Sequence, residues 1–301
     1  MQSIVYRRRK VTRGIKRAIA RIRYKNMCLH NKNVRILIIL HLFYEDSWKE
    51  IREYLYNLSF YRYELLVTVT ENRISEQTLS KIRSIDEVVR IIQVPNRGFD
   101  LGPFFEAISQ VDVREYDLII KLHSKATKRF VQYIYGQFFF RRSWFLDLFD
   151  GLLSAANIHK VIDIIYNNSF VSIVAANNLL VKDPIEKVHL YETVGRSYGL
   201  RLPDDYLFVA GTCLAMSPKH FEKLQHLGFS IDSFDRSASE SVGDLAHFLE
   251  RFICVSDGKV VGIESRPLAQ VFRRPIAFIC SFTVPVLKRI RGFIRIRWDR
   301  K

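Results

Sequence analysis

Four short apolar runs, separated by segments with a helical pattern, constrain the fold of this chain more than any other feature. The first run, residues 34–43 (VRILIILHLF), is typical of a strand buried on both faces. Three helical segments, beginning at Asp46, Ser75 and about Pro103, alternate with three further strand-like runs, residues 64–70, 88–94 and 116–122. This alternation predicts an α/β, Rossmann-type fold whose mostly parallel sheet has helices on both faces.

The second half of the chain is expected to contain more helix. A serine followed by proline, Ser217 and Pro218, predicts the start of one helix. Residues 182–202 are polar and irregular, which suggests a mobile lid. The other expected elements are helices over residues 138–166 and 242–254 and strands over residues 170–175, 206–216 and 260–263. No internal repeat or low-complexity linker interrupts this order, which favours one domain.

The positive charge of the chain is concentrated at its two ends. Residues 1–35 contain 12 Lys and Arg and no acid, and residues 266–301 contain 10 Lys and Arg and one acid, whereas residues 36–265 contain 25 bases and 30 acids. We therefore predict a basic arm (residues 1–33), a globular domain (residues 34–265) and a basic, apolar C-terminal segment (residues 266–301).

Both ends have the pattern of basic amphipathic helices. Apolar residues in the arm, such as Ile15, Ile19 and Ile22, follow helical spacing and are surrounded by arginines and lysines. Residues 275–287 are apolar but too short, and too interrupted by proline, to span a bilayer. We expect both ends to bind an anionic membrane surface peripherally. The alternatives are solvated tails or helices packed on the domain, and no nucleic-acid-binding motif supports a nucleic-acid partner.

Two polar clusters follow consecutive strands of the predicted sheet. The run NRGFDLGPFF (residues 96–105) lies between a strand and a helix, and KLHSKATK (residues 121–128) ends the next strand. The carboxyl edge of a parallel sheet, where backbone N–H groups and cations gather, is where α/β proteins bind phosphorylated ligands. The two clusters together predict the floor of a nucleotide-sugar site.

Within the first cluster, each polar residue and glycine has an expected task. Gly98 and Gly102 are expected to supply positive φ or close approach of the backbone. Asp100 is expected to bond a ribose or sugar hydroxyl, or to cap the following helix, and the two tasks are compatible. Asn96 is expected to bond a base or sugar, and Arg97 to assist in neutralising a diphosphate.

The sequence resembles the rhamnan synthesis protein F family of bacterial polysaccharide glycosyltransferases. The resemblance rests on segments within residues 35–265: HLFYEDSWKEI, VPNRGFDLGPFF, YDLIIKLHSKAT, and FVAGTCLAM with DLAHFLERF. It implies a fold similar to GT-A and transfer of a sugar, rhamnose or another hexose, from a nucleotide donor onto a lipid-linked glycan such as an O-antigen or cell-wall glycan. It also implies a location at the cytoplasmic face of the bacterial inner membrane.

The chemistry of such a transfer directs attention to the strand that ends in KLHSK. Many GT-A enzymes neutralise the leaving diphosphate with a metal held by a DxD motif, but this strand contains no DxD. Alternation along the strand places Lys121, His123 and Lys125 on one side. We therefore expect charge stabilisation by His123 and Lys125 without Mn²⁺, Mg²⁺ or another cofactor. The alternative is metal binding at Asp204 and Asp205.

The acceptor hydroxyl must lose a proton to a base in the inverting case. The family pattern has an aspartate where this chain has Val242, so Asp244 is the first candidate for the base and Glu240 the second. His247 and Arg251 are expected to support Asp244 from the same helix. The alternative for Asp244 is favourable electrostatics at a helix start without a catalytic role.

Several residues at other strand ends complete the predicted site. Gly211 and Thr212 are expected where a donor sugar or acceptor approaches, or to form a β-bulge. His41, Tyr44 and Thr70 are expected to contact the nucleotide base. A catalytically inactive scaffold in a polysaccharide assembly complex is the alternative function.

Overall fold

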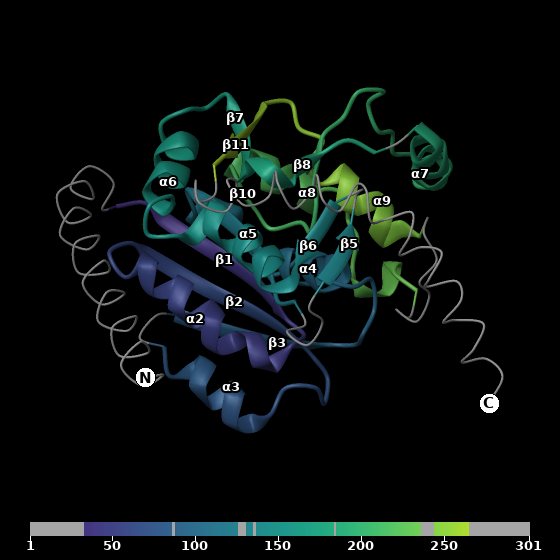
Figure 1. Ribbon diagram of the computed structural model, residues 1–301. Helices are drawn as coiled ribbons and strands as arrows, with labels where there is room; N and C mark the ends of the chain where they lie inside the picture. Colours follow the sequence, from purple (N-terminus) through teal and green to yellow (C-terminus); the bar gives the residue numbers. More distant parts are fainter. Residues whose placement is uncertain are drawn as a thin grey trace, which may run out of the picture.

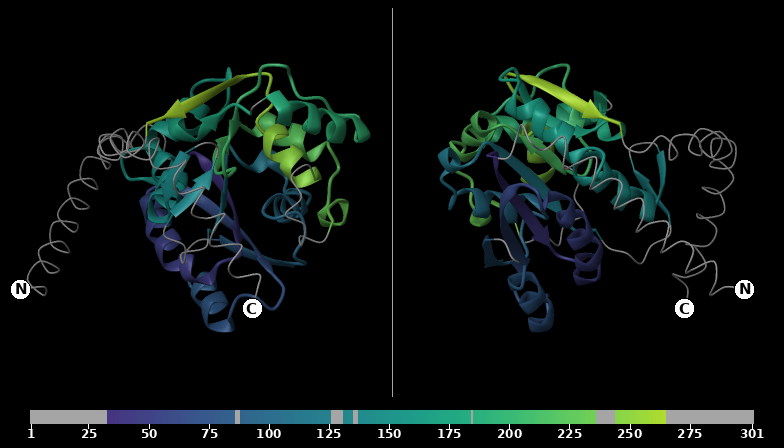
Figure 2. Two further views of the ribbon diagram at one scale, coloured as in Figure 1. Left: turned by 45° about the vertical axis from the view of Figure 1, so that its right-hand side comes forward. Right: turned by 90° about the vertical axis from the view of Figure 1, so that its left-hand side faces the viewer.

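The computed structural model describes residues 33–85, 88–125, 131–134, 137–183, 185–235 and 244–264 (Figures 1 and 2). The two basic ends predicted from the sequence lie almost entirely outside these residues, and Glu240 also lies outside them. In the described part of the chain, no helix is long and apolar enough to cross a bilayer.

A seven-stranded sheet organises the described residues, in the order β11-β7-β10-β4-β1-β2-β3. β10 is antiparallel to both of its neighbours, and the other pairs are parallel, which confirms the predicted mostly parallel α/β sheet. The strands are β1 (Arg35–Leu42), β2 (Arg62–Thr70), β3 (Val88–Val94), β4 (Leu118–His123), β7 (Val171–Ala176), β10 (Leu214–Met216) and β11 (Lys259–Ile263).

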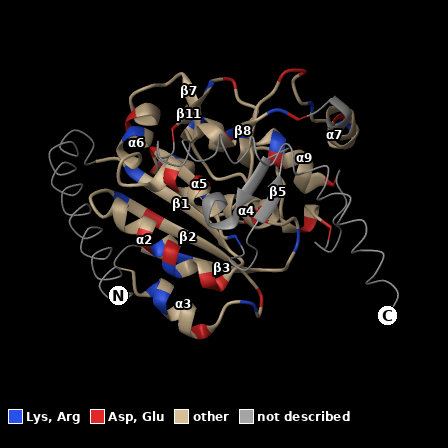
Figure 3. Ribbon diagram, in the orientation of Figure 1, with Lys and Arg blue, Asp and Glu red and all other residues tan. Residues whose placement is uncertain are grey.

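The central strands are buried because helices cover both faces of the sheet. In β1 only Arg35 is exposed, and every residue of β4 is buried. β1 and β2 are accordingly almost free of charge colouring in Figure 3, whereas basic and acidic residues lie on the helices and loops. β1 reads as a nearly continuous apolar run in the sequence, as expected for a strand covered on both faces.

Helices α2 (Trp48–Leu55), α5 (Arg141–Leu153) and α6 (Ile158–Tyr166) pack on one face of the sheet, and α4 (Leu101–Ile108) and α8 (Pro218–Gln225) pack on the other (Figure 1). α9 (Leu245–Phe252) packs against α4, and α3 (Glu76–Arg83) connects β2 to β3. Short 3₁₀ helices, η1 (Glu45–Ser47) and η2 (Tyr56–Leu58), flank α2, so the helix predicted from Asp46 to Leu58 is divided into three parts.

Two of the four predicted helix starts agree closely with the structure. Ser75 caps α3, and Ser217 caps α8 with Pro218 in its first turn. α4, however, begins at Leu101, two residues before Pro103, with Asp100 at the N-cap position. The Asp100 side chain makes no capping hydrogen bond, because its carboxylate bonds elsewhere.

Three predictions for the second half of the chain were wrong. Residues 138–140, expected in a helix, lie in β6 (Gln137–Phe140), which pairs with β5 (Val131–Ile134) in a hairpin. The expected irregular lid contains a helix, α7 (Ile185–Ser197). The expected strand over residues 206–216 is interrupted by a turn between β10 and a short β9 (Phe208–Val209), which pairs with β8 (Leu180–Val181). Short apolar segments carry too little periodicity to separate these cases.

Candidate functional site

The parallel strands β1 and β4 are neighbours in the sheet and end at the same edge, where His41 lies opposite His123. From β1 the chain runs outward through β2 to β3, then crosses back to β4 on the other side of β1. Such a reversal of strand order leaves a crevice where α/β proteins bind ligands. Because β10 is antiparallel to β4, the residues that precede β10 reach this same edge. We call this region, with residues 95–102 and 210–212, the edge site.

The turn between β3 and α4 is held in a conformation that ordinary residues avoid. Gly98 has a φ of +65° and Phe99 a φ of +54°. A Cβ atom at Gly102 would lie 2.3 Å from the carbonyl oxygen of Arg97, so the backbone approaches itself there. The two predicted roles of these glycines are thus divided: Gly98 supplies the positive φ and Gly102 the close approach.

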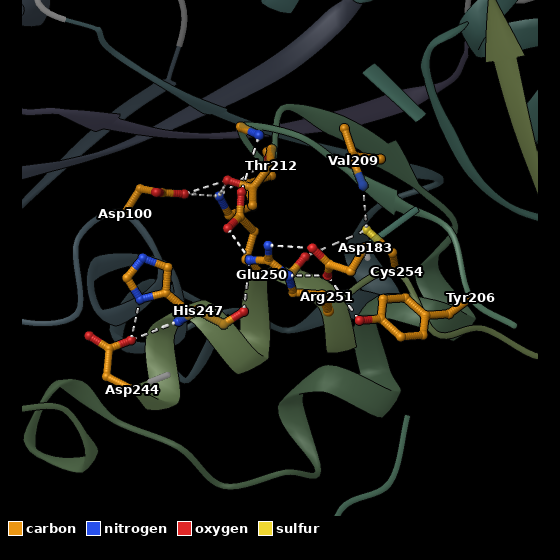
Figure 4. Close-up of polar contacts among 12 residues, drawn as sticks. Asp100, Asp183, Tyr206, Val209, Thr212, Asp244, His247, Glu250, Arg251 and Cys254 are labelled. Atoms are coloured by element: carbon orange, nitrogen blue, oxygen red, sulfur yellow. Dashed lines mark hydrogen bonds and ion pairs between the residues drawn. The ribbon is translucent and has the colours of Figure 1, made fainter. Parts of the chain in front are cut away.

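A buried ion pair connects this turn to β4. The Lys121 side chain is 1% exposed, and its Nζ donates to Asp100 Oδ2 at 2.5 Å. The same ammonium donates to Thr212 Oγ1 at 2.7 Å and to the Thr212 carbonyl at 3.2 Å. Thr212 Oγ1 in turn donates to Asp100 Oδ2 at 2.5 Å (Figure 4). Three segments far apart in the sequence therefore meet at one lysine.

The charge of Asp100 is maintained by its surroundings. Burial by itself would raise the pKa of its carboxyl, but the neighbouring side chains of His123, Lys121 and Lys125 hold that pKa well below its ordinary value. Lys121 makes the direct contact, so we assign the lowered pKa chiefly to its ammonium. The pair is therefore ionised at neutral pH, and Lys121 is a positioning group rather than a cation presented to solvent.

His123 is buried and neutral. Burial lowers the pKa of its imidazole to about 3, which outweighs the attraction of Asp100. Its Nε2 lies 2.5 Å from the Gly211 carbonyl oxygen, and its Nδ1 lies 3.1 Å from the Ser124 carbonyl oxygen. A neutral ring donates to only one of these, and the shorter distance assigns the proton to Nε2. Lys121 and His123 thus lie on β4 as predicted but are both buried, whereas Lys125 lies beyond the end of the strand and is partly exposed.

The turn before β10 is fixed from several sides. Gly211 and Thr212 both have positive φ, +77° and +47°. The Gly211 N–H donates to Glu250 Oε1 at 3.3 Å, and its carbonyl accepts from His123. A non-glycine residue in the left-handed region persists only where its surroundings determine it. Such strain is frequent at functional sites, which directs attention to Thr212.

α9 supplies a second polar layer behind this turn. Arg251 is 1% exposed and bonds Asp183 through Nε at 2.7 Å and Nη2 at 3.1 Å. Its Nη1 donates to Glu250 Oε2 at 2.5 Å, and Tyr206 donates to Asp183 Oδ2 at 2.9 Å (Figure 4). Sequence reasoning missed Asp183, because it lies in the segment expected to be irregular. A lone acid before a helical pattern gives no sign that an arginine 68 residues later pairs with it.

At the start of α9, Asp244 bonds His247, with which it was predicted to share a helix face. It is the N-cap, and its Oδ1 accepts from the His247 N–H at 2.9 Å and from His247 Nδ1 at 2.7 Å. Burial would raise the pKa of Asp244, but the hydrogen bonds from His247 lower it overall. The exposed ring of Phe99 packs edge-to-face on His247 at 5.4 Å, so this pair borders the edge site.

The predicted base-binding residues lie on the other side of the edge site. His41 is buried, and its Nδ1 lies 3.0 Å from Thr68 Oγ1. Thr70 Oγ1 is buried and has no hydrogen-bond partner among the described residues. Tyr44 is half-buried, and Asn96 is exposed. Ser124, which sequence reasoning missed, accepts hydrogen bonds from the N–H groups of the two residues after β1, Phe43 and Tyr44, at 2.8 and 2.9 Å.

The two cations expected near a diphosphate differ in their surroundings. Arg97 donates through Nη1 to Asp232 at 2.8 Å, and its side chain is 27% exposed. Lys125 is partly exposed just beyond β4. The alternative metal ligands form exposed ion pairs, Asp204 with Arg201 and Asp205 with Lys182. Within the described ranges, no three His, Cys, Asp or Glu side chains gather as a metal-binding group.

Removal of one charge from the buried pair of Lys121 and Asp100 should destabilise the folded protein. Asp100→Asn leaves the Lys121 ammonium without its counter-charge, so we expect a loss of about 3–5 kcal/mol in the free energy of unfolding. The double variant D100N/K121M removes both charges and should recover much of that loss. Urea denaturation measures both, with the exposed pair variant D205N as a control that changes little. Equal stability of D100N and the unaltered protein would contradict this account.

The buried imidazoles predict a dependence of stability on pH. Burial lowers the pKa of His41 to about 4, so the unfolded chain, with a pKa near 6.5, binds its proton first. The contribution of neutral His41 to the free energy of unfolding is complete above about pH 6.5 and is lost as the pH falls toward 4. Between about pH 7 and about pH 5.5, His41 should account for about 1 kcal/mol of lost stability.

His41→Gln keeps a polar group near Thr68 but cannot be protonated, so its urea midpoint should fall less over this pH range. His226, which is exposed, provides the matched control H226Q. An identical pH dependence for H41Q and the unaltered protein would show that His41 is not the titrating group.

Comparison with known proteins supports the resemblance seen in the sequence. The family described as rhamnan synthesis protein F matches residues 16–255, which is more than half of the chain and includes the turn after β3, all of β4 and α9. Among curated proteins, none matches the sequence significantly. The chain belongs to the rhamnan synthesis protein F family.

Proposed function

We propose that this protein is a glycosyltransferase that moves a hexose, such as rhamnose, from a nucleotide donor to a lipid-linked polysaccharide. The observation that carries the proposal is the buried Lys121–Asp100–Thr212 cluster at the switch point of the sheet. It fixes two turns with positive φ around the crevice where α/β proteins bind nucleotides. Membership of a family described by rhamnan synthesis supports the polysaccharide product.

The nucleotide base is placed near the ends of β1 and β2. Thr70 offers a buried hydroxyl without a partner among the described residues. Nearby, the guanidinium of Arg73 lies 3.5 Å from the centre of the Phe43 ring and donates to the Phe43 carbonyl. This stack gives the end of β1 a flat surface on which a base can pack, and the ring of Tyr44 lies beside it, 5.0 Å from that of Phe43.

The leaving diphosphate would be neutralised by Lys125 and Arg97 rather than by the whole KLHSK strand. Lys121 is already paired with Asp100, and His123 is neutral. In this proposal these two residues hold the turns in place, and the two more accessible cations meet the phosphates. The proposal retains transfer without a metal as its expectation.

Proton removal from the acceptor is assigned to the Asp244–His247 pair. Asp244 accepts from Nδ1 of His247, which leaves Nε2 of the neutral imidazole as a proton acceptor. A histidine oriented by a carboxylate is a common general base, whereas a carboxylate with a lowered pKa is a weak one. In this proposal His247 replaces Asp244 as the base, and Asp244 becomes the residue that positions His247. Phe99, beside His247, would supply an apolar face for the acceptor sugar.

The lipid-linked acceptor implies a membrane surface. The basic ends of the chain support peripheral binding to the cytoplasmic face of a bacterial inner membrane. They lie outside the described residues, so this part of the proposal rests on their sequence alone.

Donor binding provides the direct test of the proposed function. Purified protein is heated with dTDP-rhamnose, UDP-galactose, UDP-glucose or GDP-mannose, each with EDTA and with Mn²⁺, and the melting temperature is recorded. We expect one donor to raise it equally in both conditions, because a bound ligand stabilises the folded state. Stabilisation only with Mn²⁺ would contradict transfer without a metal. Absence of any shift would favour a scaffold role.

The assignment of the base is tested by transfer kinetics with the donor so identified. His247→Gln should lower kcat by about 10²–10⁴-fold, because the general base is lost. Asp244→Asn should lower kcat less, because the amide oxygen of Asn can still cap the helix but carries no negative charge to orient the ring of His247. His189→Gln, an exposed histidine on α7, is the control. Transfer by H247Q within twofold of the unaltered rate would refute the assignment.

A further inference from the structure

A second pocket lies at the opposite edge of the sheet from the edge site. It has a volume of about 600 Å³ and is lined by the segments that precede β7 and β11 and by the start of α8. β10 connects the two regions, because Thr212 precedes it and Ser217 follows it. Five residues of extended chain span about 16 Å, so the two sites are separate. We call this second region the rear pocket.

The charge of the rear pocket is positive. Three lysines, Lys219, Lys223 and Lys259, contribute to its lining, with one acid, Asp257. Lys223 forms an ion pair with Asp257. Neither Lys219 nor Lys259 has an ion-pair partner among the described residues, and both are exposed. Two cations therefore remain at the mouth of a cavity of the size that holds small ligands.

A buried histidine gives the rear pocket a second recognition element. His220 also contributes to the lining, is 2% exposed, and bonds the Ile253 carbonyl oxygen through Nε2 at 2.8 Å. Burial lowers the pKa of this imidazole, so it is neutral with its proton on Nε2. Its Nδ1 is buried and has no hydrogen-bond partner among the described residues. Such an orphaned acceptor is costly unless a donor reaches it.

We propose that the rear pocket binds a phosphate ester that also carries a hydroxyl group. Lys219 and Lys259 meet the phosphate, and the hydroxyl donates to Nδ1 of His220 after a small displacement of the lining that covers this buried atom. Ser172 and Ser217, which also line the pocket, add polar surface at its floor. Both a soluble sugar or glycerol phosphate and a phospholipid headgroup have this chemistry. The inference does not depend on glycosyl transfer, because it concerns a different edge of the sheet.

Calorimetric titration of the full chain tests the site with inorganic phosphate and with glycerol 3-phosphate. We expect one saturable site, tighter binding of glycerol 3-phosphate, and a loss of affinity of about tenfold or more in K219A/K259A. Both substitutions are at exposed positions, and the urea midpoint checks that the fold is retained. The double variant K49A/K160A removes two exposed lysines elsewhere and should bind as the unaltered protein does.

Phosphate could also enter the edge site, so K125A is titrated in parallel and should retain the binding. Unchanged affinity in K219A/K259A, loss in K125A alone, or no saturable binding would overturn the proposal. Equal affinity for phosphate and glycerol 3-phosphate would overturn the role of His220. Flotation with phosphatidylcholine vesicles containing phosphatidylglycerol distinguishes a phospholipid headgroup from a soluble phosphate ester. Weaker vesicle binding by K219A/K259A than by K49A/K160A identifies a headgroup, and equal vesicle binding identifies a soluble ester.

Discussion

The buried charge of Lys121 is the constraint on which the rest of the site depends. An ammonium that is 1% exposed is tolerated only if a counter-charge and further hydrogen bonds reach it. Asp100 meets that need from the turn after β3, although β2 and β1 lie between β3 and β4. α4 lies beneath β1 and β2, so it carries its own start back toward the centre of the sheet. The crossover of the chain from β3 back to β4 is therefore what brings Asp100 within reach of Lys121.

A second consequence concerns where positive charge remains available. Because Lys121 is neutralised by Asp100 and His123 is uncharged, the edge site is less basic than the sequence KLHSK implies. The polar groups instead fix the backbone at Gly98 and at Gly211, where φ is positive. Within the described residues, the edge site thus has a frame of buried hydrogen bonds and few accessible cations, so the ligand that we propose would be bound chiefly by preorganised backbone and side-chain geometry.

The sequence was sufficient to predict the strands, which depend on long apolar runs. It did not predict the features that depend on contacts between distant segments. Strands β1 to β4 were predicted because each is rich in apolar residues, and nearly all residues of β1, β2 and β4 are buried. In β3 only Val94 is buried, but its valines and isoleucines still favour a strand. The turn between β9 and β10 was missed because its conformation is imposed by tertiary contacts to Gly211 and Thr212. Strand alternation gave the side on which Lys121 and His123 point, but neither their burial nor the pairing of Lys121 with Asp100, since side-chain period contains no information on neighbouring segments.

At the start of α9, the carboxylate that caps the helix also bonds the histidine that we propose as the base. As N-cap, Asp244 places its carboxylate over the first helical turn, where the residue three positions later presents both its N–H and its ring. The cap therefore fixes the tautomer of His247 as a by-product of starting the helix. The family pattern has its acid at the position of Val242, which lies before the cap. A shift of the acid by two residues keeps a carboxylate at this helix start, and with it the means to orient the histidine.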